Sequence, residues 1–544
     1  MLRRIRTFLA VVTLLGVTLL FLDISGFLHT YLGWLAKIQF LPAVLALNVG
    51  VIIALIVLTF VFGRIYCSVI CPLGIMQDIF ARLRPRKNKK VGRYSYSPEV
   101  RWLRYPVLVL FILAVIAGFG SFVALLAPYS SFGRIVVNLL RPLYEWGNNG
   151  LAALAEHYDS YAFYSTDVWL RSLPTFFIAV ATVVLLFVLA WVGGRTYCNT
   201  ICPVGTFLSF ISRFSFLKVR FDVEKCRNCS ACTKACKAAC IDFKNHSVDY
   251  SRCVVCGNCI DACKFGALEW THSLHPDSPP ALPVREGAVT NDSCNVDARS
   301  ELTKDSHNAN ARSEHSAPSL TGRAGGESLR AGGESALSRR TFLLATAAVT
   351  TTALAQEAKL KVDGGLAEIE DKKAPERKTP LVPPGALSAK NFAQHCTGCQ
   401  LCVAQCPNQV LRPSTGLMTL MQPEMSYERG YCRPECNRCA EVCPTDAIRP
   451  ITVEEKTSTQ VGHAVWIKKN CVAVNDHVDC DNCARHCPVG AIQMVPLNPD
   501  DELGAYVPAV NEATCIGCGA CENLCPARPF SAIYVEGHEV HKEI

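Results

Sequence analysis

Six cysteine quartets constrain this chain more than any other feature, because they hold 24 of its 30 cysteines. Four quartets follow the spacing C-x2-C-x2-C-x3-C, and the two that begin at Cys432 and Cys471 differ only in a longer first gap. The six sets are Cys226, Cys229, Cys232 and Cys236; Cys253, Cys256, Cys259 and Cys263; Cys396, Cys399, Cys402 and Cys406; Cys432, Cys436, Cys439 and Cys443; Cys471, Cys480, Cys483 and Cys487; and Cys515, Cys518, Cys521 and Cys525. A loop with a thiolate at every third residue directs three sulfurs to three irons of one cubane, so the pattern predicts six [4Fe–4S] clusters.

Other uses of cysteine fit this pattern less well. Structural zinc sites also contain C-x2-C pairs, but they usually combine two separated pairs, or cysteine with histidine. A disulfide framework does not call for spacing this dense and regular. No C-x-x-C-H sequence occurs, so we expect no c-type haem in this chain. A chain with six clusters is most simply an electron-transfer protein.

The first two quartets are close enough in sequence to form one two-cluster ferredoxin. In such domains the last cysteine of each quartet ligates the neighbouring cluster. We therefore expect Cys263 to complete the first site and Cys236 to complete the second, in an α+β ferredoxin-like domain at residues 216–270. Cys240 is interpreted either as a packing thiol or as a substitute ligand.

Four apolar segments precede this domain, at about residues 8–22, 42–62, 106–126 and 174–192. The last three approach the ~20 residues that a helix needs to cross a bilayer. We expect a membrane domain of four transmembrane helices at residues 1–215, and buried helices of a soluble domain are the alternative.

Positive charges predict the orientation of these helices. Residues 82–104 contain nine Lys and Arg residues, whereas the segment between the third and fourth apolar segments contains three. Residues 82–104 and the two-cluster domain are therefore expected on the cytoplasmic side of the inner membrane. Because much of the basic excess lies beside the apolar segments, the net charge of +8 does not indicate nucleic-acid binding.

A repeat marks the inner ends of the second and fourth apolar segments. Residues 63–74 read GRIYCSVICPLG and residues 194–205 read GRTYCNTICPVG, which match at eight of twelve positions. Each copy contains C-x3-C-P, and residues four apart share one face of a helix. The pairs Cys67 with Cys71 and Cys198 with Cys202 are therefore candidates for a further redox site, either a metal centre or a thiol–disulfide couple. The alternative is that they are small packing residues at a helix bend.

The middle of the chain resembles a linker followed by an export signal. Residues 271–337 are rich in Ser, Gly, Ala, Pro and charge, which predicts disorder. Residues 338–356 begin with Ser338-Arg339-Arg340 and continue into an apolar run that ends at Ala355, a pattern typical of twin-arginine signals. After a second linker, at residues 357–390, the four-cluster domain at residues 391–544 is expected in the periplasm. It would be either tethered by this segment or cleaved after Ala355.

These motifs resemble two subunits of periplasmic nitrate reductase systems. The membrane half, with its C-x3-C-P repeats and ferredoxin pair, resembles the membrane quinol dehydrogenase subunit (NapH-like). The C-terminal half, with its twin-arginine pattern, the PPGAL sequence at residues 383–387 and four quartets, is similar to the exported polyferredoxin (NapG-like). The resemblance implies a fusion that takes electrons from the quinone pool and passes them to a periplasmic reductase or multihaem cytochrome.

Four-cluster ferredoxins often pair the first motif with the last and nest the middle two. On that pattern Cys406 and Cys525 would exchange between quartets three and six, and Cys443 and Cys487 between quartets four and five. The irregular spacing of quartets four and five leaves this pairing open.

Quinol oxidation also needs a proton acceptor. Candidates on the outer side are Asp23, His29, Glu145, His157, Asp159 and Asp167. Histidine titrates in the useful pH range, so His29 and His157 come first, and Asp78 is the inner candidate. Two alternative functions compete with quinol oxidation. They are ferredoxin-driven quinone reduction, and redox maturation or regulation of a periplasmic metalloenzyme.

Overall fold

The computed structural model describes residues 2–23, 26–84, 94–272, 370–498 and 505–544. These ranges belong to one compact unit, which comprises Met1–Pro276 and Ala353–Ile544. The predicted twin-arginine segment at 338–356 lies outside the described residues. So do Cys294 and all but the first two residues of the linker predicted at 271–337.

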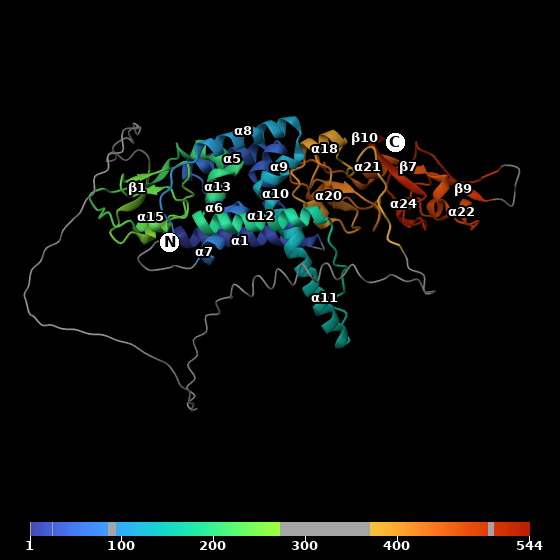
Figure 1. The fold of residues 1–544 in the computed structure, drawn as a ribbon, viewed down its shortest axis with the longest axis horizontal. Helices are drawn as coiled ribbons and strands as arrows, with labels where there is room; N and C mark the ends of the chain where they lie inside the picture. The colour runs from blue at the N-terminus through green and yellow to red at the C-terminus, as the bar shows by residue number, and fades with distance from the viewer. Residues whose placement is uncertain (1, 24–25, 85–93, 273–369, 499–504) are drawn as a thin grey trace, which may run out of the picture. The chain divides into compact units, whose positions relative to one another are not determined.

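All regular secondary structure among the described residues before β1 (Leu217–Phe221) is helical. Its elements are α1 (Leu2–Leu22), α2 (Phe27–Leu32), α3 (Trp34–Lys37), α4 (Phe40–Leu45), α5 (Val49–Phe62), α6 (Tyr66–Val69), α7 (Pro72–Leu83), α8 (Arg101–Ala117), α9 (Gly120–Leu126), α10 (Pro128–Ile135), the π-helix η1 (Val136–Leu140), α11 (Arg141–His157), α12 (Leu173–Gly193), α13 (Thr196–Thr200) and α14 (Pro203–Ser212). The axes of the long helices α1, α8 and α12 are roughly aligned, and α11 points away from them (Figure 1).

The apolar segments form fewer long helices than the sequence predicts. Within the described residues, α1 and α12 are long and apolar enough to cross a membrane, and α9 with α10–α11 would be a third span, bent by 77°. The segment predicted at 42–62 is interrupted before Asn48, whose side chain accepts a hydrogen bond from the Val51 N–H and so begins α5. The segment predicted at 106–126 is interrupted at Gly118, which ends α8 in the left-handed conformation (φ 73°). The part of the chain that the structure describes therefore does not contain four continuous spanning helices.

The helical part has an apolar exterior, and its largely apolar core also contains buried charged side chains. Large apolar side chains are exposed along its long helices, among them Phe8, Leu15, Ile53, Val57, Leu113, Ile116, Val184 and Val188. The largest fully buried side chains, in contrast, include Arg64, Arg104, Arg134 and Arg195. A surface of this kind suits lipid, whereas the interior contains charges that need partners within the protein.

Small two-stranded antiparallel sheets and short helices form the rest of the unit. The paired strands are β1 (Leu217–Phe221) with β4 (Leu268–His272), β2 (Ile241–Asp242) with β3 (Ser247–Val248), β5 (Leu411–Pro413) with β6 (Pro423–Met425), β7 (Thr459–Trp466) with β10 (Ile533–Glu543), and β8 (Ile492–Pro496) with β9 (Tyr506–Val510). The helices are α15 (Ala231–Ala235), α16 (Asn258–Ala262), α18 (Ala389–His395), α19 (Leu401–Gln405), α20 (Arg438–Val442), α21 (Val453–Ser458), η3 (Lys468–Asn470), α22 (Val472–Asn475), α23 (Asn482–Arg485) and α24 (Ala520–Leu524).

Helix α1 contacts a different ferredoxin part at each end. Near its start, Arg3 forms an ion pair of 2.9 Å with Asp261 in α16. At its end, the side-chain amide of Gln405 donates hydrogen bonds to the carbonyls of Leu20 (2.9 Å) and Asp23 (2.8 Å). A helix of 21 residues is about 31 Å long, which is close to the thickness of the hydrocarbon core.

A buried ion pair anchors the segment before α18 to the last quartet. Arg377 Nη2 lies 2.6 and 2.8 Å from the two carboxylate oxygens of Glu522, which also accepts a hydrogen bond from the Val535 N–H. Burial raises the pKa of Glu522, and the Arg377 charge opposes that shift. Glu522 therefore depends on Arg377 to remain an anion in this position.

We expect Arg377→Ala to lower the free energy of unfolding of the C-terminal part by about 3–5 kcal/mol, because it leaves a buried carboxylate without its partner. Lys378→Ala, at the exposed neighbouring position, should change it by less than about 0.5 kcal/mol. Denaturant unfolding of the full chain in detergent, followed by cluster absorbance, measures both. Equal effects of the two substitutions would contradict this role of the ion pair.

Candidate metal centres

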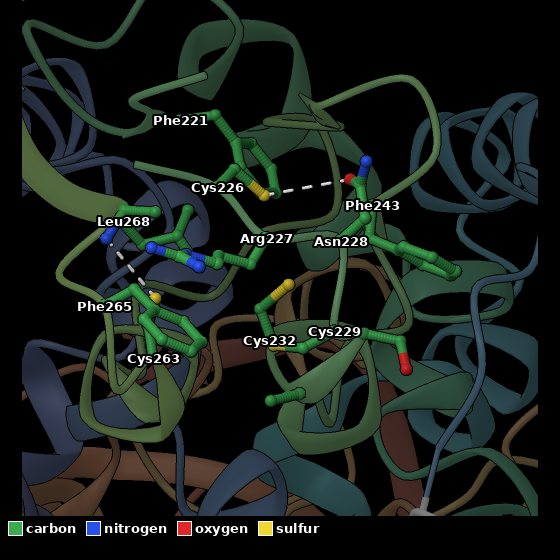
Figure 2. A pocket seen from close by; sticks show the side chains of 13 residues that line it. Phe221, Cys226, Arg227, Asn228, Cys229, Cys232, Phe243, Cys263, Phe265 and Leu268 are labelled. Carbon is green, nitrogen blue, oxygen red and sulfur yellow. Dashed lines mark hydrogen bonds between the residues drawn. The ribbon is translucent and has the colours of Figure 1, made fainter. Parts of the chain in front are cut away.

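The first two quartets line two cavities and exchange their last cysteines. One cavity is lined by Cys226, Cys229, Cys232 and Cys263, with Phe221, Phe243 and Phe265 on its walls (Figure 2). The other is lined by Cys236, Cys253, Cys256 and Cys259. This is the grouping that the two-cluster ferredoxin pattern predicts.

Backbone geometry turns these loops around their cavities. The residues immediately before α15 and α16, Ser230 and Gly257, have φ values of 57° and 73°, so the chain reverses before each short helix. The N–H of Ala267 donates to Cys263 Sγ at 3.3 Å. At the corresponding position of quartet five, Ala491 donates to Cys487 at 3.2 Å. Such N–H···S bonds stabilise thiolates and tune cluster potentials.

The four C-terminal quartets pair with their sequence neighbours. One cavity is lined by Cys406, Cys432, Cys436 and Cys439, and another by Cys487, Cys515, Cys518 and Cys521. Cys443 lies within electrostatic range of Cys396, Cys399 and Cys402, and Cys525 lies within range of Cys483. The nested pairing is therefore wrong: quartet three exchanges with four, and five with six. The physical reason is that α19 packs on α20, and α23 on α24.

The two C-x3-C-P repeats bring four buried thiols together. Cys67, Cys71, Cys198 and Cys202 are each 3% exposed. Cys198 and Cys202 both interact electrostatically with Cys67, and Cys71 interacts with Cys67 and Cys198. In the part of the chain that the structure describes, no three His, Cys, Asp or Glu side chains are placed to hold a single metal ion. The two cysteine pairs that the sequence marks as candidates for a further redox site therefore lie together.

Each repeat supplies an arginine that binds the other repeat. Arg64 Nη2 donates to the Cys198 carbonyl at 2.9 Å, and Arg195 Nη1 donates to the Cys67 carbonyl. The matching glycines make room for these contacts. A Cβ at Gly74 would lie 2.8 Å from Arg195 Nη1, and one at Gly205 would lie 2.7 Å from Arg64 Nη2. Two buried cations beside four thiols provide the charge that an anionic cluster needs.

The same arginines join this four-cysteine site to the second ferredoxin site. Arg64 Nη1 donates to the Ser251 carbonyl at 2.9 Å, two residues before Cys253. The Arg195 N–H donates to the Lys237 carbonyl at 2.8 Å, directly after Cys236. The four-cysteine site therefore lies next to the loops that carry the second cavity.

Further contacts connect the four-cysteine site, through α9, α10 and η1, to quartet three. Tyr197 directly precedes Cys198. Its hydroxyl donates a hydrogen bond of 3.1 Å to the carbonyl of Leu126, at the end of α9. On α10, Tyr129 is fully buried and within electrostatic range of Cys399 and Cys443. From η1, Asn138 donates to the Gln400 side chain at 3.0 Å. The loop of quartet three thus packs on α9, α10 and η1.

Asp78, the inner candidate for proton acceptance, is held in a buried ion-pair cluster. Arg195 binds both of its oxygens at 2.7 Å, Lys237 also pairs with it, and Arg6 lies 3.7 Å away. Burial alone would raise the pKa of Asp78, but Arg195 and Lys237 lower it well below the ordinary carboxyl value. This geometry suits a fixed anion that anchors α7 to the ferredoxin domain.

The two histidine candidates lie in different surroundings. His29 lies beside Glu441, between the last two cysteines of quartet four, and burial lowers its pKa. Its Nδ1 is buried and has no hydrogen-bond partner among the described residues. His157 is exposed at the end of α11, where its ring contacts that of Tyr158.

Cys240 lies closer to a cluster site than the sequence alone indicates. It is 1% exposed and lines the second cavity, with its sulfur 3.6 Å from that of Cys236. A hydrogen bond from Cys240 lowers the pKa of Cys236 to about 7. In the sequence, only the position of Cys240, four residues after Cys236, could have indicated this contact.

Comparisons with known proteins agree with this geometry. The family described as "4Fe-4S binding domain" matches residues 44–90 and 175–223, where the cysteines are those of the two repeats, and a second family of that description matches residues 246–269. The "4Fe-4S dicluster domain" families match residues 395–448 and 478–528, in line with the neighbour pairing. No solved structure matches the chain.

The curated proteins similar to this chain include several ferredoxin-type proteins. The methylamine utilization ferredoxin-type protein MauM of Methylobacillus flagellatus is 31% identical over 174 residues, which are 30% of this chain and 70% of MauM. The ferredoxin-type protein NapF of Escherichia coli is 29% identical over 157 residues, 29% of this chain and 86% of NapF. The ferredoxin-type protein NapG of the same organism is 29% identical over 154 residues, 27% of this chain and 65% of NapG. The chain therefore belongs to the family of iron–sulfur electron-transfer proteins that includes MauM and is related to the Nap ferredoxin-type proteins.

Proposed function

We propose that this chain is an integral inner-membrane protein that oxidises quinol and passes the electrons through [4Fe–4S] clusters to a periplasmic reductase or multihaem cytochrome. One observation carries the proposal: cysteine sites follow one another from the first ferredoxin part, through the four-cysteine site, to quartets three to six. The chain would then hold seven clusters, six in the quartets and one between Cys67, Cys71, Cys198 and Cys202. Each cluster, when bound, supplies one-electron transfer, and the protein positions and insulates it.

The sidedness is part of this proposal. Residues of the Lys- and Arg-rich segment contact the first ferredoxin part: Arg104 donates to the Ser251 carbonyl at 3.1 Å, and Arg252 donates to the Ser97 carbonyl at 2.6 Å. The positive-inside rule then assigns this part to the cytoplasm. Gln405 binds the opposite end of α1, which supports a periplasmic location for the C-terminal part, as a twin-arginine signal would require.

A cytoplasmic electron donor is a second candidate, favoured by the surface of the first cavity. Cys229 is exposed there, Arg227 also lines the cavity, and Lys234 and Lys264 are exposed close to the cysteines in sequence. A basic rim steers acidic partners, so a reduced acidic ferredoxin would fit this surface. Electrons would then enter the chain at the first site and move outward or to quinone.

The proposed seventh cluster can be tested through the amount of iron bound per chain. Cys67→Ser with Cys198→Ser should lower bound iron by about four per chain and leave the EPR signals of the other clusters in place. The same variant should slow electron transfer from the first ferredoxin part to quartets three to six. Cys294→Ser, in the predicted linker, is the control. Unchanged iron in the double variant would leave the four thiols with a packing role.

Quinol oxidation predicts direct reduction of the clusters. Menaquinol added anaerobically to the purified, cluster-loaded chain in nanodiscs should generate reduced-cluster EPR signals, and a quinone-site inhibitor should block them. Clusters that respond to dithionite but not to quinol would contradict quinol oxidation and favour the cytoplasmic donor.

A further inference from the structure

We propose that quinol is oxidised at a cleft beside η1, where Glu145 accepts its protons and the cluster of Cys396, Cys399, Cys402 and Cys443 accepts its electrons. This inference rests on the proposed quinol-oxidising function and assigns a site to it. The cleft measures about 240 Å³, counting its part open to solvent. It is lined by Val137, Asn138, Arg141, Pro142, Glu145 and the segment Trp169–Arg171.

The cleft contains a fixed anion with one oxygen available. Glu145 is 9% exposed, and its Oε1 accepts a hydrogen bond of 2.7 Å from Arg141 Nε. Among the described residues, no hydrogen bond engages its other carboxylate oxygen. Arg141 and Asn138, also buried, supply donors beside it. An anion held in place by one arginine, next to further donors, suits a hydroquinone hydroxyl that must lose a proton.

Three polar side chains that line the cleft also contact the loop of quartet three. Asn138 Nδ2 donates to the Gln400 side chain at 3.0 Å, and Arg171 Nη1 donates to the Val403 carbonyl at 2.5 Å. Arg141 Nη1 donates to the Ala404 carbonyl. Residues 400, 403 and 404 surround Cys402 in sequence. The groups that would hold quinol are therefore one hydrogen bond away from the backbone that carries a cluster ligand.

The surroundings of the cleft fit the membrane–water interface. Leu140, Leu143, Tyr144 and Trp146 are exposed at the start of α11, where they offer an apolar edge for an isoprenoid tail. Tyr158, Tyr161, Phe163 and Tyr164 are exposed further along, as in the aromatic belts of membrane proteins. The π-helix η1 adds a local distortion of the kind that often occurs at functional sites.

The reaction balances with the groups available. Quinol releases two electrons and two protons and becomes quinone. Cys396, Cys399, Cys402 and Cys443 would hold a one-electron acceptor, and the neighbouring site that includes Cys406 would hold the acceptor for its electron, so that both electrons of quinol can leave one at a time. Glu145 accepts each proton in turn and returns it to solvent through the open side of the cleft.

Glu145→Gln tests the site in the full chain. We expect quinol-driven cluster reduction to slow by about 100-fold, as for loss of a general base, with unchanged iron content and dithionite-reduced EPR signals. Glu156→Gln, at an exposed position on the same helix, is the matched control and should behave like the unmodified chain. Glu145→Asp, which keeps the carboxylate, should retain more of the rate than Glu145→Gln.

A photoreactive azidoquinone provides a second measurement that does not rely on folding of a variant. Labelling within residues 136–146 or 169–171 supports the cleft. An unchanged rate in Glu145→Gln, or labelling confined to other segments, overturns this site but leaves quinol oxidation standing. Absence of quinol-driven reduction in the unmodified chain overturns the proposed function itself.

Discussion

The crossed contacts of Arg64 and Arg195 hold the helical part of this protein together. Each arginine begins in one repeat and binds the cysteine carbonyl of the other, so neither repeat can form its site alone. Both side chains are almost fully buried, and they bind loops of the first ferredoxin part as well as the repeats. Burying two guanidinium groups is costly unless they find partners. Asp78 pairs with Arg195, and backbone carbonyls and the Asn199 side chain accept from Arg64, whose Nε has no hydrogen-bond partner among the described residues.

The same two arginines therefore position more than one site. The arginines set the position of four thiols and of the second ferredoxin cavity relative to each other. Helix α1 then connects that end of the protein to the loop of quartet three, over a length comparable to a bilayer core. In the proposed function, the buried four-thiol site between the two ends would divide one long electron transfer into shorter steps. The quinol cleft proposed beside η1 would deliver electrons directly to the outer sites.

Local motifs and long-range contacts differed in how far sequence could predict them. The exchange of Cys236 and Cys263 follows from two adjacent quartets, and the structure places these cysteines accordingly. The nested pairing of Cys406 with quartet six was wrong, because short helices of neighbouring quartets pack together. The breaks at Asn48 and Gly118 were missed, since hydropathy averages over caps and left-handed glycines.

The sequence by itself determined the chemistry of the sites, because the spacing of cluster ligands is local and repeats along the chain. It also indicated that the two repeats, which match in their Gly, Arg, Tyr, Cys and Pro residues, have a common function. Only the tertiary structure decided that the four repeat thiols meet, that Asp78 is enclosed by cations, and that Asn138, Glu145 and Arg171 line one cleft against quartet three. These groups are separated by tens to hundreds of residues, and their proximity depends on packing that no local pattern records.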